Sequence, residues 1–175
     1  MDTYIRFSEK LINFIGYLCG CLMVLMLLNV FYDVVMRYLF DIVAIGMQEL
    51  EWHLFATMFM FGIGYTLKED GHVRVDIFYE NFSAPVKASI NILGALIFTL
   101  PFCYLIITGG FDYAHEAYVM NEGSGDPGGL PHRWIIRSVI PLSSVFLLFC
   151  ALHVVMVQLR ALVFREGNDS KGANK

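Results

Sequence analysis

Charged residues are scarce in this chain. Only 16% of its 175 residues are Asp, Glu, Lys or Arg, and 57% are hydrophobic, whereas about 25% of the residues in a typical soluble domain are charged. Residues 11–32, 88–111 and 138–159 contain no charged residue at all. Because roughly 20 consecutive apolar residues are enough to cross a bilayer as a helix, these runs argue against a soluble globular protein and predict three membrane-spanning helices.

A fourth span is predicted where the apolar run is shorter. The stretch "WHLFATMFMFGIGYTL" covers residues 52–67. As a helix it reaches only roughly 24 Å of a hydrocarbon core that is roughly 30 Å thick. Either this helix stands nearly upright, or the polar residues beside it enter the membrane.

The sequence therefore predicts an all-α integral membrane protein with four transmembrane helices. A single four-helix membrane domain covers residues 1–165, and residues 166–175 form a polar cytoplasmic tail. Short amphipathic or interfacial helical segments accompany the spans, the first of them at residues 1–10. The predicted spans are residues 11–38, 49–67, 86–111 and 138–160.

Basic residues are rare on one side of the predicted membrane, and this sets the orientation. With four spans, one side carries only Arg37, Arg133 and Arg137. The other side carries Arg6, Lys10, Lys68, Arg74, Lys87, Arg160, Arg165, Lys171 and Lys175. Since Lys and Arg accumulate in cytoplasmic loops, both termini are predicted to be cytoplasmic.

Cysteines are few, and none lies in a polar segment. The four, at positions 19, 21, 103 and 150, all fall inside apolar runs, which argues against disulfides, metal thiolates or an exposed redox pair. The glycine-rich stretch "NEGSGDPGGLPHR" at residues 121–133 follows no strand and precedes no suitable Lys, Ser or Thr. It is therefore predicted to be a turn-rich outer loop rather than a phosphate-binding loop.

A short polar ladder occupies the outer end of the first predicted helix. Asn29, Asp33 and Arg37 are spaced four residues apart, so their side chains stack on one face of the helix. Asp33 and Arg37 are predicted to form an ion pair. Ladders of this kind usually hold helices together.

Two glutamates open the short second span. Glu49 and Glu51 stand just before Trp52, and ionisable groups that enter a membrane are costly and often functional. One interpretation is a proton or cation carrier. The other is a structural ion pair, either to a partner subunit or to one of three arginines on the same side, Arg37, Arg133 and Arg137.

The histidines invite a haem hypothesis, because four-helix membrane cytochromes hold haem between histidine pairs. His53 lies near the outer start of the second helix, whereas His153 lies about 15 residues into the fourth, roughly 22 Å lower. These two side chains cannot share one iron. His115 and His132 are able to approach His53 at the outer surface, but we expect no metal or cofactor in this chain.

Small residues suggest close helix packing. Gly16 and Gly20 form a GxxxG pair in the first helix. The second helix carries small side chains at Ala56, Gly62 and Gly64. Both arrangements let helix backbones approach closely in lipid. Packing within the four helices and docking of a second membrane protein remain equally open interpretations.

Two prolines bear on the last two spans. Pro101 is predicted to kink the third helix. Pro141 is predicted to lie in the first turn of the fourth helix, where a proline is tolerated.

Several features occur together in an order typical of one family. They are Arg37–Tyr38, Glu49 or Glu51 opening a short glycine-bearing helix, "GHVRVDI" at residues 71–77, and "GLPHRW" at residues 129–134 followed by Pro141. The arrangement resembles the small membrane subunit of the tripartite ATP-independent periplasmic (TRAP) transporters. The resemblance covers nearly the whole chain, and the His-Val-Arg-Val-Asp block is its most specific element.

This resemblance implies a bacterial inner-membrane subunit that is not an enzyme. A periplasmic binding protein captures an organic acid of the C4-dicarboxylate or sialic acid class, and a large elevator-type membrane subunit moves it with a sodium gradient. The small subunit extends the scaffold of the large one and holds no substrate, metal or sodium site of its own. Its outer side carries eight acids against three bases, a balance that repels an anionic substrate.

The resemblance also implies structural or partner-interface roles for a set of residues. His72, Arg74 and Asp76 are predicted to pin the inner end of the second helix to lipid phosphate or to the large subunit. The full set is Arg37, Glu49, Glu51, Gly62, Gly64, His72, Arg74, Asp76, Pro131, Trp134 and Pro141. Two other function classes remain as alternatives, a haem-binding membrane redox subunit and a small self-sufficient exporter that uses a membrane glutamate.

Overall fold

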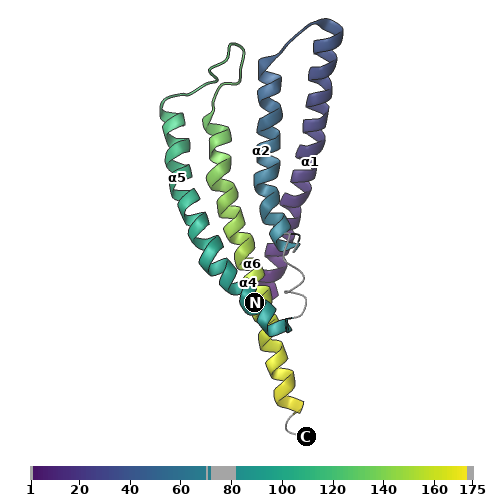
Figure 1. Cartoon of the computed structure of the whole chain (residues 1–175), viewed down its shortest axis with the longest axis vertical. Coiled ribbons are helices and arrows are strands. Elements are labelled where there is room, and N and C mark those ends of the chain that lie inside the picture. The colour runs from purple at the N-terminus through teal and green to yellow at the C-terminus, as the bar shows by residue number, and fades with distance from the viewer. Residues whose placement is uncertain (1, 70, 72–81, 173–175) are drawn as a thin grey trace.

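The computed structural model describes residues 2–69, 71 and 82–172. Its elements are the α-helices α1 (Asp2–Phe40), α2 (Ile45–Lys68), α4 (Ala84–Gly94), α5 (Leu100–Val119) and α6 (Trp134–Gly172), with the π-helical segment η1 (Ala95–Thr99) between α4 and α5 (Figure 1). The part of the chain that the structure describes contains no strand. The predicted all-α class is therefore confirmed.

The first helix is longer than predicted. The predicted span covers residues 11–38, with residues 1–10 along the membrane surface, and α1 runs unbroken from Asp2 to Phe40. Its first turns stay in line with the rest because Ser8 and Ile12 are fully buried. With 39 residues, α1 extends about 58 Å, well beyond a hydrocarbon core of roughly 30 Å.

The helices lie side by side in a row rather than in a square bundle. α1 packs on α2, α2 on α6 and α6 on α5 (Figure 1). The loops at residues 41–44 and 120–133 lie at one end, which we call the loop end. The N-terminal part of α1 and α4 lie toward the other end, the tail end, where the two hairpins converge. α1 and α5 thus form opposite edges of the row.

The small buried core lies where α1, α2 and α6 meet. Ile12, Phe146 and Cys150 form it. Partly buried side chains pack around them, namely Ile15, Phe61, Tyr65, Leu67 and Phe149.

Glycines in α1 and α2 differ in their surroundings. A Cβ atom at Gly16 would meet the ring of Tyr65, and one at Gly64 would lie 2.8 Å from Phe146. These two glycines therefore serve packing within the chain. Gly20 and Gly62, by contrast, have no atom within 4 Å of such a Cβ and line an open hollow between α1 and α2.

The prediction for Pro141 was wrong. α6 begins at Trp134, so Pro141 is inside the helix rather than in its first turn. The proline is fully buried, and a Cβ at Gly110 of α5 would lie 3.0 Å from its Cδ. The absence of a side chain at residue 110 makes room for the ring and lets α5 approach α6 closely.

Pro101 accompanies an irregularity in the third predicted span. That span comprises α4, η1 and α5, and the winding changes to a π-helix over Ala95–Thr99. Pro101 follows in the first turn of α5. A proline provides no N–H for the helical hydrogen-bond ladder, and π-helical turns accommodate such breaks.

Three helical stretches are long and apolar enough to cross a membrane, Thr3–Phe40, Pro85–Val119 and Trp134–Leu162. They match three of the four predicted spans. α2 is not among them, because polar and charged residues at both of its ends lower its mean hydropathy.

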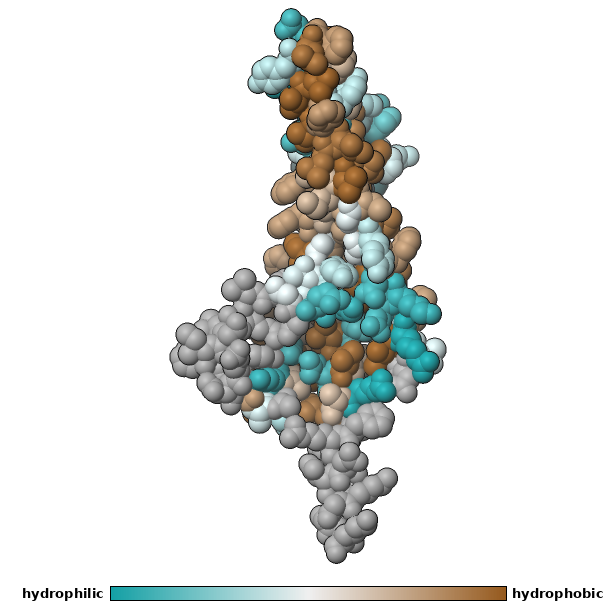
Figure 2. Space-filling model, turned by 90° about the vertical axis from the view of Figure 1, so that its right-hand side faces the viewer, coloured by the Kyte–Doolittle hydropathy of each residue, from teal (hydrophilic) through white to brown (hydrophobic). Residues whose placement is uncertain are grey.

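On the side of α1, hydrophobic residues cover most of the upper part of the surface, and hydrophilic residues gather below them (Figure 2).

Candidate functional site

A single carboxylate fastens the long loop to α2. Glu49 is the fifth residue of α2, and its side chain is buried. One carboxylate oxygen accepts a hydrogen bond from Ser124 Oγ, and the other accepts one from the backbone N–H of Leu130 at 2.6 Å. Both donors belong to the loop at residues 120–133, so Glu49 holds the two ends of that loop against the start of α2.

The loop is shaped to receive this carboxylate. Gly128 has a φ of +83°, and a Cβ at Gly129 would lie 2.8 Å from Glu49 Oε2. Only glycine therefore lets the backbone approach the carboxylate so closely. The N–H of Ser124 donates to the Leu130 carbonyl at 3.0 Å, which closes the loop on itself.

Glu49 forms no ion pair with the three arginines of the loop end in the described residues, so that part of the prediction was wrong; a pair to a partner subunit stays a prediction. The arginines of the loop end have other partners: Arg37 pairs with Asp33, while Arg137 and Arg133 face Glu122 at 2.5 and 4.0 Å. A hydroxyl group and a backbone amide take the place of a cation at Glu49. Sequence spacing did not reveal them, because both donors lie more than 70 residues along the chain; the pair Gly128–Gly129 was the available signal for a close backbone approach.

Glu51 differs from Glu49 in having no such partner. Its side chain is partly buried, and it makes no hydrogen bond or ion pair with any residue that the structure describes. Of the two glutamates, Glu49 alone therefore joins separate elements.

A second fastening joins α5 to α6 at the loop end. The Arg137 guanidinium binds Glu122 and lies 3.9 Å from the centre of the Tyr113 ring. Nearby, the rings of Tyr118 and Trp134 meet edge to face with centres 5.5 Å apart. These contacts combine a charge-assisted hydrogen bond with cation–π and aromatic packing.

The polar ladder of α1 holds α1 to α2. The predicted ion pair between Asp33 and Arg37 is confirmed. Asn29 Nδ2 donates a hydrogen bond to the backbone carbonyl of Met47 at 2.8 Å. Within the described residues, Asn29 Oδ1 and Arg37 Nε are buried without a hydrogen-bond partner.

The two histidines of the haem hypothesis have separate partners. His53 Nδ1 bonds the backbone carbonyl of Glu49 on its own helix. His153 is buried in α6, and its Nδ1 lies 2.6 Å from Ser8 Oγ of α1. Among the residues described, no three His, Cys, Asp or Glu side chains are grouped so that they could hold a metal ion.

The remaining predicted site residues do not gather at one place. Trp134 opens α6, Pro131 is exposed in the loop, and Gly62 borders the hollow between α1 and α2. His72, Arg74 and Asp76 lie outside the described residues.

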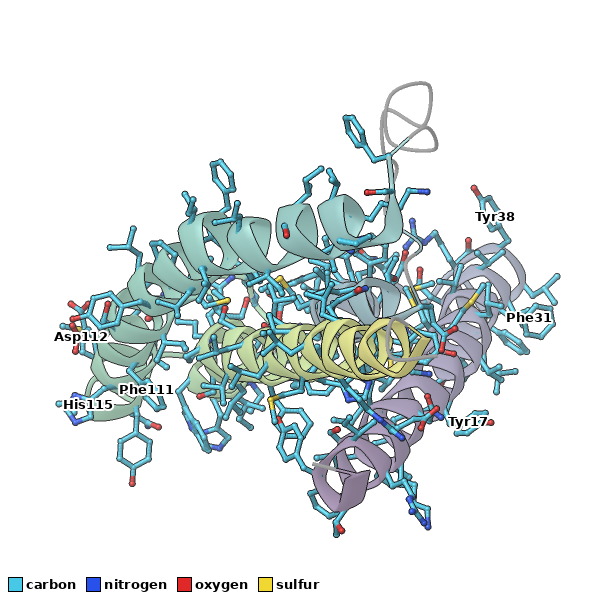
Figure 3. All side chains as sticks on the ribbon, turned by 90° about the horizontal axis from the view of Figure 1, so that it is seen from below. Tyr17, Phe31, Tyr38, Phe111, Asp112 and His115 are labelled. Atoms are coloured by element: carbon cyan, nitrogen blue, oxygen red, sulfur yellow. The ribbon has the colours of Figure 1, made fainter. Side chains whose placement is uncertain are left out.

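The edges of the row present side chains that sequence reasoning did not single out. Tyr17, Phe31 and Tyr38 point outward from α1, and Phe111, Asp112 and His115 point outward from α5 on the opposite side of the molecule (Figure 3). Their exposure became visible only once the helices were placed in a row.

Residues 26–161 match the model of the family described as "Tripartite ATP-independent periplasmic transporters, DctQ component". The chain belongs to this family. It is a component of a TRAP transporter and a multi-pass protein of the inner membrane.

A curated relative supports the assignment. Over 125 residues the chain is 26% identical to the "C4-dicarboxylate TRAP transporter small permease protein DctQ" of Pseudomonas aeruginosa (strain PAO1). The match covers 65% of this chain and 58% of the relative. The chain thus spans less than two thirds of the relative's length.

Proposed function

We propose that this chain is a non-catalytic scaffold subunit of a sodium-coupled secondary transporter for organic acids. Its large elevator-type membrane partner moves the substrate and uses the sodium, and a periplasmic binding protein delivers the substrate. The observation that carries the proposal is the family match over residues 26–161. The relative's name points to C4-dicarboxylates, and the sialic acid class is the second candidate.

The proposed topology has four spans with both termini in the cytoplasm. Its support is that α2 lies between α1 and α6 and that the two described loops lie together at the loop end (Figure 1). The flanking helices shield the polar ends of α2 from lipid, which lowers the cost of a short span. In this topology the loop end is periplasmic, in agreement with its few basic residues.

A scaffold role is supported by how the polar side chains are used. Glu49 fastens the long loop to α2, Asn29 ties α1 to α2, and Ser8 with His153 ties α1 to α6. A carrier group must be free to exchange its ligand, whereas these groups are engaged between elements. His72, Arg74 and Asp76 are proposed to hold the tail end of α2 to the large subunit or to lipid phosphate.

The test is co-purification followed by transport. The chain is expressed with its chromosomal neighbours and is purified through a tag on the small chain. We expect the large protein in equal amount, and uptake of labelled succinate or sialic acid by proteoliposomes only when both subunits, a sodium gradient and the binding protein are present.

Three results would overturn the proposal. Uptake by the small chain alone would point to a self-sufficient exporter. A haem absorbance band in the purified small chain, or failure of any large partner to accompany it, would remove the scaffold interpretation.

A further inference from the structure

An apolar groove runs along one face of the row between α2 and α5, with α6 as its floor. Near the loop end it contains a cavity of about 290 Å³, bordered by Trp52, Ala56 and Met60 of α2 and by Tyr113 of α5. Toward the tail end it opens into a wider hollow of about 570 Å³ beside Ile63 and Leu67 of α2.

The two hollows lie in line along the same faces of α2 and α6, and we take them as one groove. The α2 residues that border them occupy positions 52, 56, 60, 63 and 67, and spacings of three and four place all five on one helix face. On α6, positions 136, 140 and 147 form a matching stripe. The α2 stripe is 15 residues long, which corresponds to about 22 Å.

Two arginines stand at the loop-end mouth of this groove. Arg137 is bound to Glu122 at 2.5 Å and lies over Tyr113. Arg133 lies 4.0 Å from the same Glu122 carboxylate and forms no hydrogen bond through its guanidinium within the described part of the chain. Its side chain is 35% exposed.

The carboxylates near Arg133 are already engaged. Glu122 is shared with Arg137. Glu49 interacts with Arg133 only over a distance, and its carboxylate accepts hydrogen bonds from Ser124 and Leu130. The guanidinium of Arg133 therefore retains several free N–H donors at the rim of an apolar groove. Such a rim is suited to an anion whose remainder is apolar.

We propose that the groove binds one phospholipid from the leaflet at the loop end, with the phosphate at Arg133 and an acyl chain along α2. Trp52 and Tyr113 lie beside the mouth, where aromatic rings sit at headgroup level. One leaflet contributes roughly 15 Å of hydrocarbon, so a groove of about 22 Å holds a full acyl chain. This site does not depend on the transport function proposed above.

The experiment is a lipid titration of the full chain, purified in mild detergent and observed by native mass spectrometry. The probes are palmitoyl-oleoyl phosphatidylglycerol and the diacylglycerol with the same chains, which lacks the phosphate. We expect one phosphatidylglycerol to bind, and the diacylglycerol to bind about tenfold more weakly, because charge-assisted hydrogen bonds to the phosphate are lost.

Two variants test the two halves of the site, each with a matched control. Arg133→Gln removes the cation but leaves the Arg137–Glu122 pair, and we expect about tenfold weaker binding; Arg37→Gln removes a cation at the loop end of α1 and should leave binding unchanged. Ala56→Leu fills the cavity and should block the lipid. Gly62→Leu adds a slightly larger group to the hollow between α1 and α2 and should not.

Several outcomes would overturn the site. They are equal binding of the two probes, phosphatidylglycerol binding that neither Arg133→Gln nor Ala56→Leu reduces, or controls that reduce binding as much as the test variants. Cross-links from a photoreactive amino acid placed at position 56 to a helix of the large partner would place a protein segment there instead. Gel filtration and circular dichroism check that each variant is folded, and the two variants act by different means, so the loss of one leaves the other test intact.

Discussion

At the scale of single residues, Glu49 joins two elements that are far apart in the sequence. Its carboxylate joins the start of α2 to Ser124 and Leu130 in a loop that lies more than 70 residues further along the chain. The sequence predicted an ion pair to an arginine or to a partner subunit as the structural role of Glu49, and it did not indicate the bonds from Ser124 and Leu130. A backbone N–H carries no side-chain signature, and the path of a glycine-rich loop depends on turns that local propensity does not determine.

Glu49→Ala should free the loop at residues 120–133. The N–H of Leu130 and the hydroxyl of Ser124 lose their acceptor, so we expect amide hydrogen exchange in the peptide that covers this loop to become about tenfold faster. Hydrogen exchange with mass spectrometry measures this directly.

The matched control is Glu51→Ala, because Glu51 lies two residues away and has no partner among the described residues. It should leave exchange in the loop unchanged. Equal acceleration in both variants, or none in Glu49→Ala, would show that Glu49 does not fasten the loop.

At the scale of elements, contacts of α2 with α1 and α6 rest on small residues. Gly64 packs against Phe146 and Cys150 of α6, and Gly16 of α1 packs against Tyr65 of α2. The sequence identified the relevant glycines in both helices but not which of them are covered, because that depends on how each helix is rotated about its axis. The predicted span began at residue 138, where the apolar run begins, whereas α6 begins at Trp134. The proline at residue 131 suggested that the loop continued further.

Gly64→Ala and Gly62→Ala form a matched pair on α2. A Cβ at residue 64 would lie 2.8 Å from the buried ring of Phe146, so overpacking should lower the free energy of unfolding by about 1–3 kcal/mol. At residue 62 the added methyl group meets nothing within 4 Å.

Thermal unfolding of the two purified variants measures the difference. Both substitutions change the intrinsic helix propensity equally, so the gap between them isolates packing. If Gly64→Ala were as stable as Gly62→Ala, α2 and α6 would not approach each other as described.

At the scale of the whole molecule, the row leaves its edges open. Only 6% of the most apolar stretch of α1 and of the Pro85–Val119 segment is buried, compared with 39% in the corresponding stretch of α6. The family and three of the four predicted spans are confirmed, because charge-free runs and the "GHVRVDI" motif are local signals. It did not predict the row, because the order of helices side by side depends on contacts between distant segments.

A hydrophobic photoreagent should label the isolated chain unevenly. We expect strong labelling of outward residues such as Tyr17 and Phe31 on α1 and Phe111 on α5, and weak labelling of the α6 stretch around Phe146 and Cys150. Peptide mapping by mass spectrometry reads out the pattern.

Repeating the labelling in the complex with the large subunit identifies the covered edge. Protection confined to α1 or to α5 would mark the interface. Uniform labelling of all four long helices in the isolated chain would contradict the row.

In a row, a helix at either end has fewer neighbouring helices than a helix in a square bundle has. In the row α1, α2, α6, α5 the main interfaces are those between neighbours, and α1 meets α6 in a smaller contact near the tail end. The helices at the two ends of the row, α1 and α5, therefore each have a long side that no other described helix covers. A membrane helix of a partner that packed on α1 or on α5 would lengthen the row by one helix.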